Sequence, residues 1–158
     1  MLYAVLKLVH LLSLVVWIGG MFFTLACLRP SLGVLDAPTR PRLMSAVLLR
    51  FFAIVNAAIG LVLVSGVSML WIAWRAASAA AGGFSMPLSW IVMIVLGATM
   101  MAIFGHLRGG LHRRLQAALR AQDAPAAASL LARIRAWVVV NLALGVAVVA
   151  VMKVGAIL

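Results

Sequence analysis

The sequence predicts an all-α membrane protein, an antiparallel bundle of four transmembrane helices that extend into the cytoplasm. Composition and the spacing of apolar runs predict this class. Of the 158 residues, 67% are hydrophobic and only 9% are charged, and the mean hydropathy is +1.25. A soluble domain has roughly 25% charged and 45–50% apolar residues. Because a chain of this size could not bury so much apolar surface in water, we expect a single integral membrane domain over residues 1–158.

Four apolar runs are each long enough to cross a hydrocarbon core of ~30 Å, which needs about 20 helical residues. Isolated strands cannot satisfy their backbone hydrogen bonds in lipid, so each run is expected to be a helix. The predicted transmembrane helices are residues 2–28, 51–74, 87–106 and 136–158.

The arginines predict which side of the membrane each connection occupies. The first and third connections are rich in arginine, whereas the second connection, residues 75–86, contains only Arg75. By the positive-inside rule, the first and third connections lie in the cytoplasm, and the second connection and both termini lie outside. The formal charge of +11 is therefore assigned to membrane flanks in contact with the lipid bilayer, and we expect no nucleic-acid partner.

The third connection is predicted to be a helical hairpin. Leucines recur at helical spacing on both sides of a break at residues 122–125, where Asp123 can cap a new helix and Pro125 suits its first turn. Asp36 and Pro38 predict a similarly early start for the second helix.

Polar and small residues mark the helix faces that meet inside a membrane bundle. Asn56 and Gly60 are expected on the inner face of the second helix, with Gly66 to one side of it. For Asn56, Asn141 and the glycines, packing and hydrogen bonding between helices explain the pattern without a catalytic role. The inner faces expected on the first, third and fourth helices contain, in that order, His10, Ser13, Trp17, Gly20 and Thr24; Met86, Ser89, Met93, Gly97, Met100 and Phe104; and Asn141, Gly145, Val148 and Met152.

His10 is the candidate functional residue, because an ionisable side chain within a span indicates a site by default. The alternative to a functional role is a structural one, in which His10 is a neutral imidazole that donates a hydrogen bond to a neighbouring helix. At ~1.5 Å per residue, His10 lies roughly 12 Å below the outer surface, and Met93 and Met152 fall near the same depth. One imidazole with several thioethers suits Cu(I), with Met86 near the outer surface and Met100 and Met152 lining the same cavity.

Histidine with methionine is also an axial pair for haem iron, so His10, Met93 and His106 are candidate haem ligands. His106 lies at the inner end of the third helix, about 16 Å from His10 along the membrane normal, which is too far for one shared metal ion. His112 is expected among arginines in the cytoplasmic hairpin, where its replacement should change little.

Other chemistries are excluded. The spans contain no acidic residue, and the sequence has no CxxC pair, Ser/His/Asp set or glycine-rich phosphate loop. Proton pumping by carboxylates, hydrolysis and nucleotide chemistry therefore have no residues to use, and the single Cys27 excludes an internal disulfide.

The first helix resembles that of the CopD-like copper-resistance membrane family and is similar to that of the HemJ-type membrane protoporphyrinogen oxidase. The most specific part is His10 followed by Trp17-Ile18-Gly19-Gly20. Further matching residues are Met1-Leu2-Tyr3, Leu6-Lys7, Phe22-Phe23, Arg29-Pro30, Arg50-Phe51, Gly60, Gly66, Trp90, Arg135 and Asn141.

The two relatives imply different chemistry. The CopD resemblance implies copper handling or transport at a bacterial inner membrane, with a periplasmic copper carrier or a redox partner. The oxidase resemblance implies bound haem, the histidine of helix one and a lysine early in helix three. His10 matches that histidine, but helix three contains no lysine, and Met93 or a close neighbour stands in its place.

Three functions therefore remain open. The first is an inner-membrane copper-handling protein with an outward-facing His/Met site. The second is a protein that binds haem b, either an electron-transfer protein or, if it is an enzyme, a haem-dependent oxidoreductase. The third is a metal-free structural or assembly bundle.

The topology is testable by cysteine labelling. A cysteine placed at Ser78 should react with an impermeant thiol reagent in intact cells, because the second connection lies outside. Cysteines placed at Asp36 or Gln122 should be protected. Labelling at Gln122 would show that the predicted orientation is reversed. The site at His10 would then not face outward.

Overall fold

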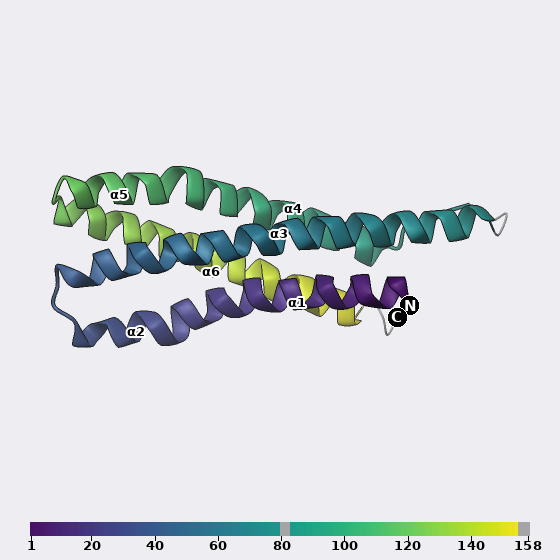
Figure 1. Cartoon of the computed structure of the whole chain (residues 1–158), viewed down its shortest axis with the longest axis horizontal. Helices are drawn as coiled ribbons and strands as arrows, with labels where there is room; N and C mark the ends of the chain where they lie inside the picture. The colour runs from purple at the N-terminus through teal and green to yellow at the C-terminus, as the bar shows by residue number, and fades with distance from the viewer. Residues whose placement is uncertain (80–82, 155–158) are drawn as a thin grey trace.

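The chain folds into four long helical rods, as the computed structural model of residues 1–79 and 83–154 shows (Figure 1). Helices account for all regular structure in these residues, which confirms the all-α class. The first rod comprises α1 (Leu2–Phe23), the π-helical segment η1 (Thr24–Leu28), α2 (Arg29–Ser31) and the 3-10 turn η2 (Leu32–Val34). The second rod is α3 (Thr39–Ala79). The third comprises α4 (Leu88–His106), the π-helical segment η3 (Leu107–Leu111) and α5 (His112–Arg120), and the fourth is α6 (Ala124–Val154).

The two ends of the bundle are different. The connections at residues 35–38 and 121–123 lie together at one end, which we call the hairpin end (Figure 1). The N-terminus and the last described turns of α6 lie toward the other end, the terminal end (Figure 1).

Each rod is long and apolar enough to cross a membrane. The rods continue past the apolar runs toward the hairpin end, as the helical spacing of the third connection predicts. The predicted fourth span includes residues 155–158, which lie outside the described residues. The qualifying helical stretches are Leu2–Val34, Thr39–Ala79, Leu88–Arg120 and Ala124–Lys153.

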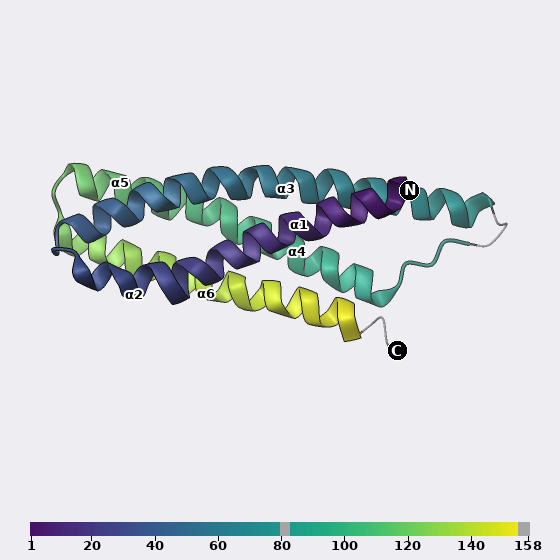
Figure 2. The same ribbon diagram turned by 60° about the horizontal axis from the view of Figure 1, so that its bottom comes forward.

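The rods pack mainly in two pairs. α1 packs chiefly against α3, and α4 chiefly against α6, while a smaller contact joins α1 to α6 (Figure 2). Long apolar side chains such as Val15, Val64 and Val146 remain exposed on the outside. This arrangement suits lipid, because the outer face of each rod stays apolar while smaller and polar groups turn inward.

An aromatic cluster fills the core between the rods. Trp17 meets Phe104 edge-on with ring centroids 6.3 Å apart, and Phe104 meets Phe52 in the same way at 5.6 Å. Phe52 in turn meets the ring of His112 at 5.3 Å. Edge-to-face contacts at these distances are favourable, so the cluster connects α1, α3, α4 and α5.

The two carboxylates of the chain both cap helices. Asp123 Oδ1 accepts a hydrogen bond of 2.9 Å from the backbone N–H of Ala126, which confirms the predicted cap of the last helix. Asp36 Oδ2 accepts from the hydroxyl and the backbone N–H of Thr39, at 2.9 and 3.1 Å. The hydroxyl of Thr39 is the main reason that the pKa of Asp36 lies below its usual value.

The inner face of α3 differs from the prediction. Asn56 and Gly60 are exposed, whereas Ser45, Phe52 and Ser65 are buried. The prediction gave priority to the asparagine, but on a helix this apolar the hydrophobic pattern is too uniform to orient the faces. The inner faces expected for the other helices are confirmed at His10, Ser13, Trp17, Met100, Phe104, Asn141, Gly145 and Val148.

Gly145 is tightly enclosed and should not tolerate a larger side chain. A Cβ atom there would lie 2.9 Å from Cγ1 of Ile18 and 3.2 Å from Cε of Met100, whereas a Cβ at Gly60 would meet nothing within 4 Å. Gly145→Val should therefore lower the free energy of unfolding by about 1–3 kcal/mol through overpacking.

Gly60→Val is the matched control, because it makes the same change at an exposed position of α3. Thermal unfolding of the purified variants in detergent measures both effects. Equal melting temperatures would show that the contact between α6 and α1 is looser than described.

Candidate metal centre

His10 is buried on α1 and faces α3. Its ring Nδ1 lies 3.0 Å from the hydroxyl oxygen of Ser65. A Cβ atom on Gly66 would lie 3.3 Å from His10 Cε1, so the imidazole packs directly against the backbone of α3. The small side chains of Ser65 and Gly66 make the space for the ring.

The hydrogen bonds of Ser65 determine the tautomer of His10. The Ser65 hydroxyl donates to carbonyl oxygens one turn earlier on α3, those of Leu61 and Val62. A hydroxyl has only one proton to donate, so its oxygen accepts from His10. Nδ1 of His10 therefore carries the hydrogen, and the lone pair of the ring is on Nε2.

This contact corresponds to the alternative expected for His10, a neutral imidazole that donates to a neighbouring helix. The sequence alone does not mark Ser65 as the acceptor, and its pattern predicts Gly66 to one side of the inner face. The pair of adjacent small residues was the available signal, because such pairs let two helices approach closely in lipid.

The predicted methionine partners lie on other elements. Met93 is half-buried on α4, which packs chiefly on α6, and the described contacts of His10 do not include it. Met86 is half-buried in the connection before α4, and Met152 is half-buried near the end of α6. The pairing of His10 with these thioethers stays a prediction.

Met100 is the most deeply buried of the predicted methionines, and it packs against Gly145 of α6 and the core. One turn further along α6 toward the hairpin end, the amide of Asn141 donates to the sulfur of Met21 at 3.6 Å. The other amide atom, Asn141 Oδ1, is buried without a hydrogen-bond partner among the described residues. The centre of the bundle thus holds two thioethers and one unpaired acceptor.

The other two histidines lie toward the hairpin end. His106 is exposed and meets Trp137 edge-on at 5.7 Å. His112 is buried, and its Nε2 donates to the carbonyl oxygen of Ser45 at 3.3 Å. The expectation that His112 lies among solvated arginines is therefore wrong, because its ring joins the aromatic cluster through Phe52.

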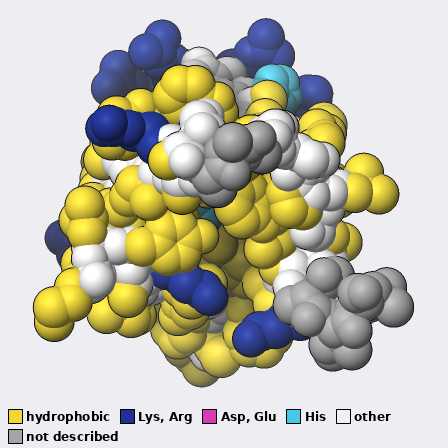
Figure 3. All heavy atoms as spheres, turned by 90° about the vertical axis from the view of Figure 1, so that its right-hand side faces the viewer, with side chains coloured by type: hydrophobic (Ala, Val, Ile, Leu, Met, Phe, Trp, Pro, Cys, Tyr) yellow, Lys and Arg dark blue, Asp and Glu magenta, His cyan; other side chains and the backbone are white. Residues whose placement is uncertain are grey.

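No group of three or more His, Cys, Asp or Glu side chains within the described residues could hold a metal ion. Histidine, cysteine and carboxylate side chains therefore do not form a metal site by themselves in this part of the chain. The terminal end offers access to the interior, since a hollow walled by hydrophobic side chains opens there (Figure 3).

Comparison with known proteins gives one match. The family model of CopD, copper resistance protein D, matches residues 45–155, which include most of α3 and all of α4, α5 and α6. No curated protein and no solved structure matches the chain. His10 precedes the matched residues, whereas Ser65 and the four predicted methionines fall within them.

The burial of His112 generates a stability prediction. His112→Ala would remove a ring contact with Phe52, leave a cavity and lose the hydrogen bond to Ser45, so the free energy of unfolding should fall by about 2–4 kcal/mol. His106→Ala is the matched control, and its exposed ring should leave the melting temperature nearly unchanged. If His112→Ala were as stable as the control, the His112 ring of the wild-type protein would have to be exposed to solvent.

Proposed function

Since the family model covers most of the chain, the protein belongs to the copper resistance protein D family, and we propose that it handles copper ions at a site built around His10. The ion is cargo in this proposal. The site opens toward the terminal end, which the arginine distribution predicts to lie on the outer side of the membrane.

The observation that carries the proposal is the contact between His10 and Ser65. Histidines that bind metals usually donate their second ring N–H to a fixed acceptor, which sets the tautomer and the ring orientation. Ser65 provides that acceptor for Nδ1. The lone pair of Nε2 is then available to an ion.

The register of the rods supports a methionine partner at the depth of His10. α1 and α4 run in the same direction, and Trp17 lies beside Phe104. Counting back seven residues from each places Gly97 level with His10, and Met93 and Met100 stand about one turn to either side of it. Met152 is close to the same depth on α6, because Ile18 lies beside Gly145 and the two helices are antiparallel.

The softness of the donors supports copper over harder metals. Thioether and imidazole ligands favour Cu(I), whereas Mg²⁺ and Ca²⁺ require oxygen ligands that this end of the chain does not offer as carboxylates. A Cβ atom at Gly97 would meet nothing within 4 Å, so the space beside α4 at the level of His10 is open. Met86, in the connection before α4, would then be the first thioether that an incoming ion meets.

Copper retention by the purified chain tests the proposal. The protein in detergent is loaded with Cu(I) under reducing conditions and washed, and bound copper is measured by mass spectrometry. His10→Ala should abolish retention while leaving the helical circular dichroism unchanged. Met93→Leu, which nearly conserves volume, should weaken retention without unfolding the bundle.

A further variant tests the role of Ser65, and another serves as the control. Ser65→Ala should weaken copper binding by about 10–100-fold, as outer-shell partners of metal ligands do, while His106→Ala should bind normally. Full copper occupancy in His10→Ala, or its loss in His106→Ala, would contradict the proposed site. An absorption spectrum with a Soret band would instead indicate haem.

A further inference from the structure

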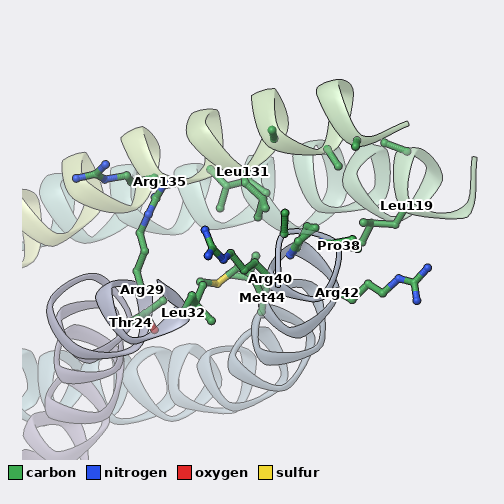
Figure 4. Close-up of a pocket in the computed structure, with 18 of the residues that line it drawn as sticks. Thr24, Arg29, Leu32, Pro38, Arg40, Arg42, Met44, Leu119, Leu131 and Arg135 are labelled. Atoms are coloured by element: carbon green, nitrogen blue, oxygen red, sulfur yellow. The ribbon is translucent and has the colours of Figure 1, made fainter. Parts of the chain in front are cut away.

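A cavity of about 890 Å³ lies at the hairpin end, away from His10. It separates the end of the first rod and the start of α3 from α5 and α6 (Figure 4). The walls are mainly apolar and include Leu25, Leu48 and Val138. Arg29, Arg40, Arg42 and Arg135 also line it.

Two of these arginines come together from different rods. The Arg29 side chain extends from α2 across the cavity and ends beside Arg135 of α6 (Figure 4). The Arg135 guanidinium lies close enough to oppose the positive charge of Arg29. Such a like-charge pair on the wall of a cavity is unfavourable unless an anion lies between the two groups.

The protein supplies little negative charge to this pair. Its only carboxylates, Asp36 and Asp123, accept hydrogen bonds as helix caps. Asp123 does line the cavity, but it stands at the tip of the hairpin, twelve residues before Arg135. That separation is about 18 Å along a helix. Arg40 is occupied by the turn, where it donates to the carbonyl oxygens of Leu35 and Gly33 at 2.8 and 3.1 Å.

The pair lies where the apolar runs end, which is the depth expected for lipid headgroups. Arg29 follows the apolar run of the first rod directly, and Arg135 directly precedes the apolar run of α6. Leu25 and Val138 are about one turn further toward the membrane on the same two rods. The cavity therefore presents positive charge at the headgroup layer and apolar walls on its membrane side.

We propose that this cavity binds the phosphate headgroup of an anionic phospholipid between Arg29 and Arg135, with the start of an acyl chain against Leu25, Leu48 and Val138. Arginine recognises phosphate oxygens through two parallel N–H donors, and basic pockets between transmembrane helices bind anionic headgroups in this way. The lipid comes from the leaflet at the hairpin end. The site uses none of the residues proposed for copper.

Lipid titration by native mass spectrometry of the purified chain in nonionic detergent tests the proposal. Phosphatidylglycerol should bind as a discrete adduct, more tightly than phosphatidylcholine with the same acyl chains. Arg29→Gln and Arg135→Gln should each weaken the apparent affinity for phosphatidylglycerol about fivefold. Arg133→Gln is the matched control, because it removes an exposed charge on α6 that does not line the cavity.

A second measurement separates binding from folding. Without anionic lipid, Arg135→Gln should melt at a higher temperature than the wild-type protein, because the substitution removes the repulsion at Arg29. Added phosphatidylglycerol should stabilise the wild-type protein but should not raise the melting temperature of Arg135→Gln further. Arg135→Lys should retain part of the lipid effect.

Three results would overturn the proposal. They are equal binding of the two lipids by the wild-type protein, undiminished binding of phosphatidylglycerol by the double variant Arg29→Gln with Arg135→Gln, or the same stabilisation by inorganic phosphate alone. Copper retention should be unchanged in Arg135→Gln, so this test is independent of the site at His10.

Discussion

Close approach between α1 and α3 is the constraint on which the rest of the bundle depends. A Cβ atom on Gly20 would overlap the ring of Phe51, and one on Gly66 would press on His10. Each helix thus contributes one glycine that lets the other helix approach. The two contacts, at Gly20 and at His10, are about 15 Å apart along α1. Because lipid tails are as apolar as leucine, van der Waals contact and hydrogen bonds hold such helices together. The buried imidazole obtains its acceptor from α3 for the same reason.

The fold could be predicted from the sequence because its strongest signals are long and simple. Four apolar runs fix the rods, and Asp123 with Pro125 fixes the start of α6. The rotation of α3 could not be predicted in the same way. Asn56 suggested an inner face, yet the buried stripe follows Phe52, Val55 and Ser65. In a helix that is apolar all round, one polar residue is a weak guide, since packing against neighbours decides which face is inside.

The candidate site was predictable only in part. His10 stands out because a buried imidazole in a span needs a partner, but that partner, Ser65, is an ordinary residue until α3 is placed beside α1. His112 was misjudged because its neighbours in sequence are arginines, whereas its neighbours in space are Phe52 and Ser45. The most specific part of the resemblance lies in the first helix, before the family match at residues 45–155, while Arg50-Phe51, Trp90 and Asn141 fall within that match. Both observations support the same family.

The basic residues are divided between the two ends by type as well as by number. Both lysines, Lys7 and Lys153, belong to the terminal end, together with Arg75, whereas the formal positive charge of the hairpin end comes from arginine alone. A guanidinium does not lose its proton in a protein, and it is not a substrate for acetylation of an amine. The hairpin end therefore carries a permanent charge, which neither an alkaline shift nor lysine acetylation can remove.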